Sequence, residues 1–178
     1  MSETEMAGML ASPDIAQQLK QGLRRLGKAV VVITCWHDNR RWAMTATAVS
    51  ELSMDPPSLL ICVNRTASLY EPLVAGANFC VNILHAGQAG VSMACSGAEK
   101  GEARFREGVW DSACCGTPYL RDAQASFICE FEKQVEYGTH IVVIGAVKEV
   151  LTSGDVDPLI YLDGGYRRVD ANQGAALA

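Results

Sequence analysis

The stretch MTATAVSELSMDPPSLLICVN, residues 44–64, decides the fold of this 178-residue chain. It begins with small and hydroxyl-bearing side chains, passes through a double proline and ends in an apolar run. Pro56 and Pro57 lack backbone N–H donors and have fixed φ angles, so they end one strand and start a connection to the next. The apolar run at 58–64 is therefore predicted to form a second, buried strand.

Five small residues precede the double proline: Thr45, Ala46, Thr47, Ala48 and Ser50. A strand of such residues lets its backbone lie close against a flat ligand, because larger side chains would hold that ligand away. The alternative is an ordinary barrel strand, in which the threonines simply favour β structure.

The rest of the chain is rich in β-type patterns. Further strands are predicted at 29–35, 78–84, 127–132, 140–150 and 159–162. The first of these is expected to form a hairpin through residues 36–39 that leads into 44–64, and Gly145 marks a bend or bulge. Many strands and few helices predict a mainly β fold, a closed or partly closed antiparallel barrel.

One helix is predicted near the N-terminus, at 12–26. Ser12 and Pro13 supply a cap and a first-turn proline, and Gly27 closes the helix. Apolar residues repeat at helical spacing, at Ile15, Leu19, Leu23 and Leu26. This stripe is expected to be buried against the body of the protein.

A second, short helix is predicted after the apolar strand. Ser68 and Glu71 have the spacing of a capping box, in which serine and glutamate side chains satisfy free backbone N–H groups. Gly76 closes this helix, and Pro72 keeps it short or partly 3₁₀. A third helix is predicted within 86–96, and a loop-rich region follows at 97–120.

Composition sets the class of protein. Apolar residues make up 49% and charged residues 20% of the chain, which is ordinary for a globular domain, and the net charge of −5 argues against nucleic acid or an anionic membrane as a partner. One domain is expected at 12–170, with flexible ends at 1–11 and 171–178. The absence of a signal sequence or long apolar span predicts a cytoplasmic location.

Seven cysteines have no C-x-x-C spacing, so no zinc or other metal site is expected and the cysteines are predicted to be thiols. Cys114 and Cys115 are expected to be adjacent, exposed thiols. No P-loop or dinucleotide-binding glycine pattern is present, and the three histidines, His37, His85 and His140, do not stand at metal-ligand spacing. What remains is a site made of backbone and small side chains, which suits a planar cofactor that brings its own reactivity.

Three motifs in order resemble the short-chain flavin reductases, the reductase components of two-component flavin-dependent monooxygenases. They are residues 44–64, then Gly138-Thr139-His140, then 158–161 with Gly164-Gly165-Tyr166-Arg167. The resemblance covers residues 19–169. It implies an FMN-binding split barrel, a Greek-key antiparallel barrel with a few short helices, and a homodimer.

The resemblance also implies a flavin bed. It places the isoalloxazine ring along residues 45–48, with a hydroxyl of Thr45 or Thr47 donating to it, and counts Ser50 among the cofactor-binding residues. The cofactor continues along Cys62, Val63 and Asn64. Ser68 then lies near the ribityl and phosphate oxygens, at a helix start that favours anions. The alternative for Ser68 is a plain helix cap.

Basic and aromatic residues complete the implied site. Lys100, Arg104 and Phe105 stand where the family has a basic residue followed by phenylalanine, so a cation would neutralise the pyrophosphate of FAD while Phe105 packs on the ring. Glu102 and Ala103 depart from the aspartate that many relatives carry before this arginine. A solvated surface lysine is the alternative for Lys100.

The nicotinamide end of the site is assigned to three further residues. The resemblance places His140 beside the nicotinamide, at the rim of the barrel, and Tyr166 and Arg167 close the same pocket after two glycines. A rim histidine without function is the alternative for His140. Dimer contact or core packing is the alternative for Tyr166.

The implied activity is NADH-dependent flavin reduction, with hydride passing from nicotinamide C4 to flavin N5. Reduced FAD, or FMN, would go to a separate oxygenase component acting on an aromatic compound. Lys100 and Arg104 favour FAD, and NADH is preferred because no basic cluster is assigned to a 2′-phosphate, although Arg167 and Arg168 could supply one. The alternatives are a flavin-binding sensor or storage module, and a flavin-dependent reductase of a corrinoid or ferric complex.

Overall fold

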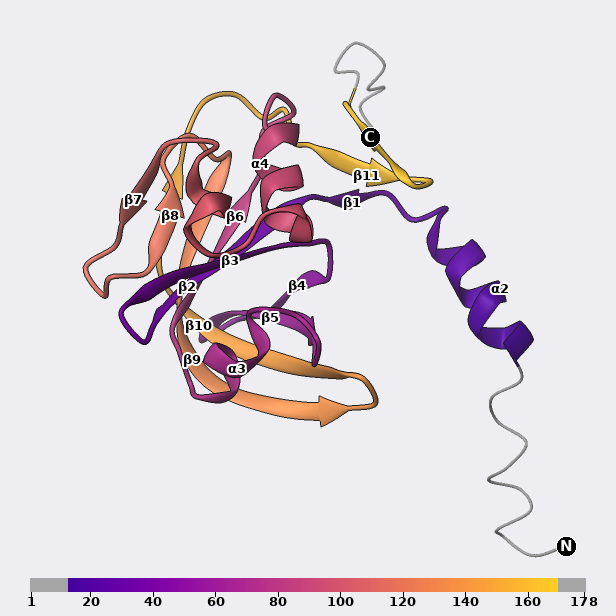
Figure 1. Cartoon of the computed structure of the whole chain (residues 1–178), viewed down its shortest axis with the longest axis horizontal. Helices are drawn as coiled ribbons and strands as arrows, with labels where there is room; N and C mark the ends of the chain where they lie inside the picture. The colour runs from indigo at the N-terminus through magenta and orange to yellow at the C-terminus, as the bar shows by residue number, and fades with distance from the viewer. Residues whose placement is uncertain (1–12, 170–178) are drawn as a thin grey trace, which may run out of the picture.

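The computed structural model describes residues 13–169. The predicted flexible ends at 1–11 and 171–178 and the predicted cap at Ser12 therefore lie outside the described residues. The body of the protein is an antiparallel sheet of seven strands in the order β3-β2-β6-β9-β10-β5-β4, curled into a barrel (Figure 1). Its strands are β2 (Val31–His37), β3 (Arg40–Ala46), β4 (Val49–Met54), β5 (Pro57–Asn64), β6 (Phe79–Ile83), β9 (Ala125–Tyr137) and β10 (His140–Thr152).

The barrel is split between the two edge strands. β3 and β4 follow one another in the chain but form opposite edges of the sheet, and no ladder joins them among the described strands. The backbone N–H of Cys62 in β5 instead donates to the carbonyl of Ala48, at 3.0 Å. Thr47 and Ala48 lie between the strands, which corrects the prediction of one continuous strand there. The mainly β, split-barrel class is confirmed.

β2 is buried on both faces. Val31 and Ile33 point into the barrel core, whereas Val30, just before the strand, and Val32 belong to a second core outside the barrel. A strand covered on both faces has no polar alternation, which explains the continuous β-branched run in the sequence. The predicted strand 29–35 is interrupted at Val30, and its first part is the separate strand β1 (Lys28–Ala29).

An outer layer covers the second core. It contains α4 (Ala89–Met93), a π-helical turn η1 (Ala94–Ala98), a 3₁₀ helix η2 (Gly101–Phe105), the pair β7 (Trp110–Ser112) and β8 (Pro118–Leu120), and the strands β11 (Ile160–Leu162) and β12 (Gly165–Arg167). β11 pairs with β1 and with β12. The strands β7, β8 and β12 were not predicted, because strands this short carry no clear periodicity. Within 13–169, no helix has the length and apolarity needed to cross a membrane.

The predicted turns and the predicted bulge are present. Asp38 and Asn39 have φ angles of 51° and 56° and join β2 to β3 as a two-residue hairpin. In the ladder between β9 and β10 the register shifts between Ile144 and Gly145, which confirms the bulge. The local sequence therefore determines the backbone conformation both at the hairpin turn and at the bulge.

The capping box predicted at Ser68 is wrong. α3 (Tyr70–Val74) has Leu69 as its N-cap, with no side-chain capping bond. The Ser68 hydroxyl lies before the helix and bonds across the fold, as described below. α3 is short, as Pro72 predicted.

The N-terminal helix also departs from its prediction. α2 (Pro13–Leu23) stands away from the barrel, joined to it through β1 (Figure 1). Its apolar stripe was expected to be buried, but Ile15 is 61% and Leu19 60% exposed. The helical periodicity is present, but the barrel does not cover the apolar stripe.

Gly145 gives a test of barrel packing. A Cβ at this position would lie 2.5 Å from Phe79 Cζ and 2.8 Å from Cys129 Cβ. We expect Gly145→Ala to lower the free energy of unfolding by about 2 kcal/mol, because a packed core does not admit an added methyl group. The urea midpoint measures this loss. Gly22→Ala is the control, since its Cβ meets nothing within 4 Å, and equal midpoints for the two variants would contradict the argument.

Candidate functional site

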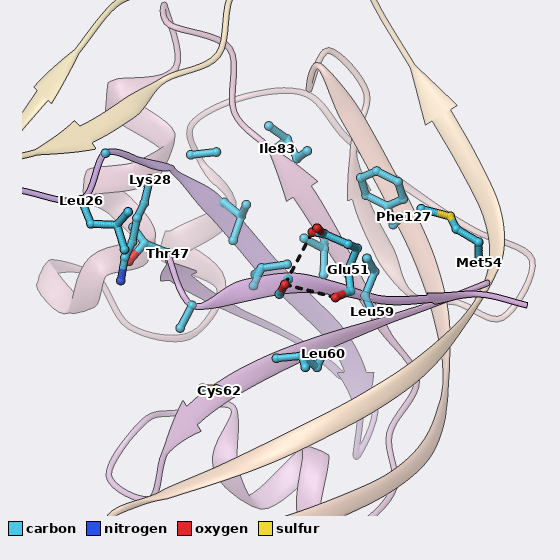
Figure 2. A pocket seen from close by; sticks show the side chains of 17 residues that line it. Leu26, Lys28, Thr47, Glu51, Met54, Leu59, Leu60, Cys62, Ile83 and Phe127 are labelled. Carbon is cyan, nitrogen blue, oxygen red and sulfur yellow. Dashed lines mark hydrogen bonds between the residues drawn. The ribbon is translucent and has the colours of Figure 1, made fainter. Parts of the chain in front are cut away.

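The split in the barrel opens into an apolar cavity of about 670 Å³, which we call the seam cavity. Four residues of the predicted flavin bed line it, namely Thr47, Ala48, Ser50 and Cys62. Its remaining walls are mostly aliphatic, with Phe127 on one side (Figure 2). A flat apolar ring system is the kind of group that such a cavity accommodates.

The polar groups of the seam cavity are few. Ser50 Oγ donates to the carbonyl oxygen of Glu51 at 3.1 Å and lies 3.5 Å from its carboxylate, as Figure 2 shows. Lys28 and Glu51 are the charged residues of its lining. Thr47, which carries a hydroxyl, and Lys28 both belong to this lining (Figure 2).

A second cavity of about 340 Å³, the cationic cavity, lies at the other end of β3. It brings together three predicted residues, Ser68, Lys100 and Arg104. Residues 40–43 and Thr66 complete the wall that faces them. Four cations line this cavity, Arg40, Arg41, Lys100 and Arg104, in a chain whose net charge is −5. Such a concentration of positive charge favours an anionic ligand.

Arg104 is held by a set of backbone and hydroxyl acceptors. Its Nη1 donates to the Ala43 carbonyl and to Ser68 Oγ, both at 2.5 Å, and its Nε donates to the Glu99 carbonyl at 2.9 Å. These acceptors orient the guanidinium but do not neutralise it. None of the ion pairs among the described residues involves Arg104, so its charge is available to a ligand anion.

Arg41 is positioned by an aromatic ring and a carboxylate. Its guanidinium lies 4.2 Å from the centroid of the Phe105 ring, and it forms an ion pair with Glu102. The hydrogen bond from Arg41 holds the pKa of the Glu102 carboxyl below its ordinary value. Phe105 is itself buried, with its ring 5.1 Å from that of Trp110. One face of the Phe105 ring is therefore covered by Arg41.

Three adjacent residues of the cationic cavity, Arg40, Arg41 and Trp42, were not predicted from the sequence. Arg40 stacks over Trp42, 3.7 Å from the ring centroid, and both line the cavity with Arg41. The available signal was the basic pair directly after the Asp38-Asn39 turn. Nothing in the local sequence, however, indicates that this pair meets Lys100 across the fold.

β3 and β5 connect the two cavities. The chain runs from Ala43, which is in β3 and lines the cationic cavity, to Thr47, which follows β3 and lines the seam cavity, about 13 Å at the rise of an extended strand. β5 passes Cys62 in the seam cavity and ends at Asn64, whose Oδ1 accepts from the Thr66 backbone N–H at 2.9 Å. We call this path between the two cavities the track. An apolar cavity at one end and cations at the other suit a flat ring joined by a chain to a phosphate, so the residues present fit a flavin nucleotide.

Thr45 and Tyr166 are linked through Ser92. Thr45 Oγ1 donates to the Ser92 carbonyl at 2.6 Å, and Ser92 Oγ lies 2.8 Å from the Tyr166 hydroxyl. Of the two predicted threonine donors, Thr45 thus already has an acceptor within the protein. Tyr166 also packs against the second core, so it ties β12 to α4 behind the flavin bed.

Two predicted bed residues face the barrel core. Ala46 packs against it, and the Val63 side chain is fully buried in it. The alternation of β5 sends Ile61 and Val63 inward and leaves Cys62 at the cavity. For Val63 only the backbone is left to contact a ligand.

His140 and Arg167 are placed apart from the two cavities. His140 begins β10, is exposed, and pairs across the ladder with Asn64, with its Nδ1 2.9 Å from Thr139 Oγ1. It therefore lies beside the middle of the track. Arg167 is exposed and donates to the Tyr166 carbonyl, and it lines neither cavity.

The comparison with protein families decides between the readings of this site. Residues 23–170 match the family described as flavin reductase like domain. The chain belongs to this family. The flavin reductase predicted from the three sequence motifs is confirmed, and the split barrel is the family's architecture.

Curated relatives and solved structures of this flavin reductase family are similar along most of the chain. The FMN reductase (NADH) RutF of Methylorubrum populi is 37% identical over 167 residues, 94% of this chain and 81% of the relative. The reductase component of an FADH(2)-dependent resorcinol hydroxylase from Rhizobium sp. is 39% identical over 159 residues, covering 88% and 89%. The NADH:FAD oxidoreductase SgcE6 of Streptomyces globisporus C-1027, solved with NAD and FAD fragments, superposes with a TM-score of 0.83 at 25% identity, covering 93% and 99%.

Cysteine reactivity reports on the seam cavity. Burial raises the pKa of Cys35 and Cys129 to about 12 and that of Cys95 to about 11, so these thiols stay protonated at pH 8. Cys114 is exposed and Cys62 is half-buried at the cavity.

In the native flavin reductase at pH 8 we expect fast alkylation of Cys114 and Cys115, slower alkylation of Cys62, and reaction of the buried thiols only on unfolding. Added FMN should protect Cys62, because the ring would cover its thiol. Pulsed iodoacetamide labelling with mass spectrometry measures this, and Cys114 is the internal control. Equal labelling of Cys62 with and without flavin would place the ring elsewhere.

The cationic cavity predicts a phosphate-dependent effect of Arg104. We expect Arg104→Ala to weaken FMN binding about 10- to 100-fold, the loss of one charge-assisted contact, and to leave riboflavin binding unchanged. Fluorescence titration measures both. Arg121→Ala is the control, since Arg121 pairs with Asp111 at 2.8 Å outside the cavity. A similar loss for riboflavin would mean that Arg104 acts through the fold.

Proposed function

We propose that this flavin reductase uses NADH to supply reduced FAD, or FMN, to a separate monooxygenase component that acts on an aromatic compound. The observation that carries the proposal is the apolar seam cavity joined by β3 and β5 to the cationic cavity. The relative named as the reductase component of a resorcinol hydroxylase supports the oxygenase partner. The partner and its substrate follow from that likeness and not from the site.

The number of cations favours FAD over FMN. Arg104, with Ser68 beside it, provides the contacts that one phosphate needs. Arg40 and Lys100 add positive charge on the same cavity, which suits the second phosphate of a pyrophosphate, while Arg41 is paired with Glu102. The relative named as an FMN reductase keeps FMN as the alternative.

The ion pair of Arg168 near the predicted nicotinamide end favours NADH over NADPH. Arg168 pairs with Asp157 at 2.7 Å, whereas Arg167 donates to the Tyr166 carbonyl and keeps its charge. One of the two adjacent arginines is thus already neutralised by a carboxylate. A 2′-phosphate would have to compete with Asp157 for Arg168.

In this proposal the side chains of the protein position the flavin and the nicotinamide. A bound flavin supplies the redox chemistry, accepting hydride from the nicotinamide. Arg104 and Lys100 hold the phosphate end, the Thr47 hydroxyl is placed to donate to the ring edge, and His140 positions the nicotinamide from beside the track. Correct placement of the two rings is the main contribution of such a protein to the rate.

The domain and assembly predictions belong with this proposal. We assign the flavin reductase activity to one domain at 12–170. We also propose a homodimer, because large apolar side chains remain exposed on α2 and on β4, where Met54 is 80% exposed.

The activity is tested with purified protein, NADH or NADPH, and FAD, FMN or riboflavin under anaerobic conditions. We expect flavin reduction with NADH to be faster than with NADPH, and FAD to have a lower KM than FMN. Riboflavin should have the highest KM, because it has no phosphate. Absence of pyridine-nucleotide-dependent flavin reduction would overturn the proposal.

His140 is tested by a separate substitution. We expect His140→Ala to raise the KM for NADH about 10-fold, the loss of one hydrogen bond to a charged or polar partner, with the KM for flavin unchanged. His37→Ala, in the turn after β2, is the control. An unchanged KM for NADH in the His140 variant would remove His140 from the nicotinamide site.

A further inference from the structure

A third cavity, of about 380 Å³, lies next to the seam cavity, and we call it the lysine cavity. The seam cavity and the lysine cavity share the lining residues Leu26, Lys28 and Thr47. In Figure 2 these three residues gather at one end of the seam cavity, away from Phe127 and Met54. A ligand that fills the seam cavity therefore has a path past Lys28 into the lysine cavity.

Within residues 13–169, two ammonium groups of the lysine cavity have no carboxylate partner. Lys20 and Lys28 line the cavity, and neither takes part in an ion pair of this part of the chain. The third cation of the lining, Arg24, differs, because its Nε donates to Asp163 Oδ1 at 2.8 Å. Two unpaired positive charges side by side favour a ligand that carries two negative charges.

Secondary structure positions both lysines. Lys28 is the cross-strand partner of Tyr161 in the ladder between β1 and β11, so the two side chains leave the same face of this small sheet. Lys20 lies one helical turn before Arg24, whose backbone N–H donates to the Lys20 carbonyl at 3.2 Å. Arg24 is fixed in turn, because the Asp163 backbone N–H donates to its carbonyl at 3.0 Å. The two ammonium groups thus reach one cavity from two anchored segments.

An aromatic ring and two leucines complete the lysine cavity. Tyr161 is 41% exposed, and its ring centroid lies 5.9 Å from that of Tyr166 in an edge-to-face arrangement. Leu23 and Leu26 line the cavity as well, and both are exposed. Aromatic rings and apolar side chains are the groups on which a nucleic-acid base packs. The lysine cavity therefore combines the contacts that a nucleoside diphosphate needs.

We propose that the lysine cavity binds the adenosine diphosphate half of NADH, with Lys20 and Lys28 at the two phosphates and Tyr161 at the adenine. The nicotinamide half then lies in the seam cavity, on the flavin ring. This inference rests on the proposed NADH-dependent reduction of flavin. It adds to that function a second anion site, separate from the cationic cavity.

Electrostatics favour separate sites for the two dinucleotides. The flavin and nicotinamide rings must overlap for hydride transfer, whereas the phosphates of the two molecules repel one another. The cationic cavity lies at the start of β3, and the lysine cavity lies beyond its end, at Thr47. The two phosphate groups are therefore held at opposite ends of this strand. Because Asp163 already neutralises Arg24, the lysine cavity has unpaired charge for a pyrophosphate and none for a further 2′-phosphate.

Steady-state kinetics test Lys20 first, because its exposed side chain lines the lysine cavity and not the seam cavity. We expect Lys20→Ala to raise the KM for NADH about 10-fold, the loss of one charge-assisted contact, with kcat and the KM for flavin unchanged. Lys20→Arg keeps the charge and should keep the KM. Arg25→Ala is the matched control, since Arg25 lines neither cavity and donates to the Gln21 carbonyl. An unchanged KM for NADH in Lys20→Ala would overturn the proposal.

A hydride donor without phosphates separates phosphate binding from hydride transfer. Reduced nicotinamide riboside carries the same nicotinamide as NADH but has neither phosphate nor adenine. We expect Lys20→Ala to lower kcat/KM for NADH about 10-fold and to leave kcat/KM for the riboside at the wild-type value. An equal loss with both donors would mean that Lys20 acts through the fold, which would overturn the assignment.

The adenine contact is tested at Tyr161. We expect Tyr161→Ala to raise the KM for NADH about 10-fold, because a stacked base loses its aromatic partner, and Tyr161→Phe to keep the wild-type KM. The riboside should not distinguish these variants. Equal KM values for NADH in Tyr161→Ala and Tyr161→Phe would remove the adenine from this ring.

Calorimetric titration with ADP-ribose, without flavin, tests the site independently of reductase activity, because ADP-ribose has no nicotinamide. We expect Lys20→Ala/Lys28→Ala to weaken its binding about 100-fold, the loss of two charge-assisted contacts. Arg104→Ala, in the cationic cavity, should leave it unchanged. Binding that depends on Arg104 and not on the lysines would place ADP-ribose in the cationic cavity and overturn the proposal. Lysine-dependent binding in a protein that reduces no flavin would refute the reductase function but support the nucleotide site.

Discussion

The incomplete closure of the barrel is the constraint on which the rest of the structure depends. β3 and β4 are consecutive in the chain yet lie at opposite edges of one sheet, so the curl of the sheet must bring them together without a ladder. The hydrogen bond from the Cys62 N–H to the Ala48 carbonyl marks where the edges meet. A complete ladder there would fill the seam. The missing pairing leaves the seam cavity, which small residues such as Thr47, Ala48 and Ser50 line together with larger apolar side chains.

The buried side-chain amide of Asn82 connects the barrel to the outer layer, which carries Lys100 and Arg104. Asn82 in β6 donates to the Val32 carbonyl at 2.9 Å and accepts from the Leu120 N–H at 2.8 Å and from Ser126 Oγ at 2.9 Å. It thereby joins β2, β6, β8 and β9. Fully satisfied polar networks of this kind fix one arrangement of a core. The outer layer is thus held in register with β3, and Arg104 can reach the Ala43 carbonyl.

Long-range contacts account for the errors in the predicted site. Ser68 and Glu71 have the spacing of a capping box, but Arg104, 36 residues away, takes the serine hydroxyl as an acceptor. The helix start that was expected to bind phosphate belongs to a five-residue helix, so the cations are the stronger source of attraction. Phe105, which the motif assigns to the flavin, is buried and supports Arg41, a contact that the motif did not indicate.

The sequence by itself determined the local conformations and the class of fold: the hairpin at Asp38 and Asn39, the strand break at the double proline, the bulge at Gly145 and the periodicity of α2. These follow from φ angles, missing donors and residue spacing, which are properties of neighbouring residues. Only the tertiary structure decided which distant residues are in contact, such as Arg104 and Ser68. It also decided that the apolar side chains of α2 are exposed and not packed on the barrel. The physical reason is that spacing shows that a face is apolar, while the surface that covers the face depends on how the barrel closes.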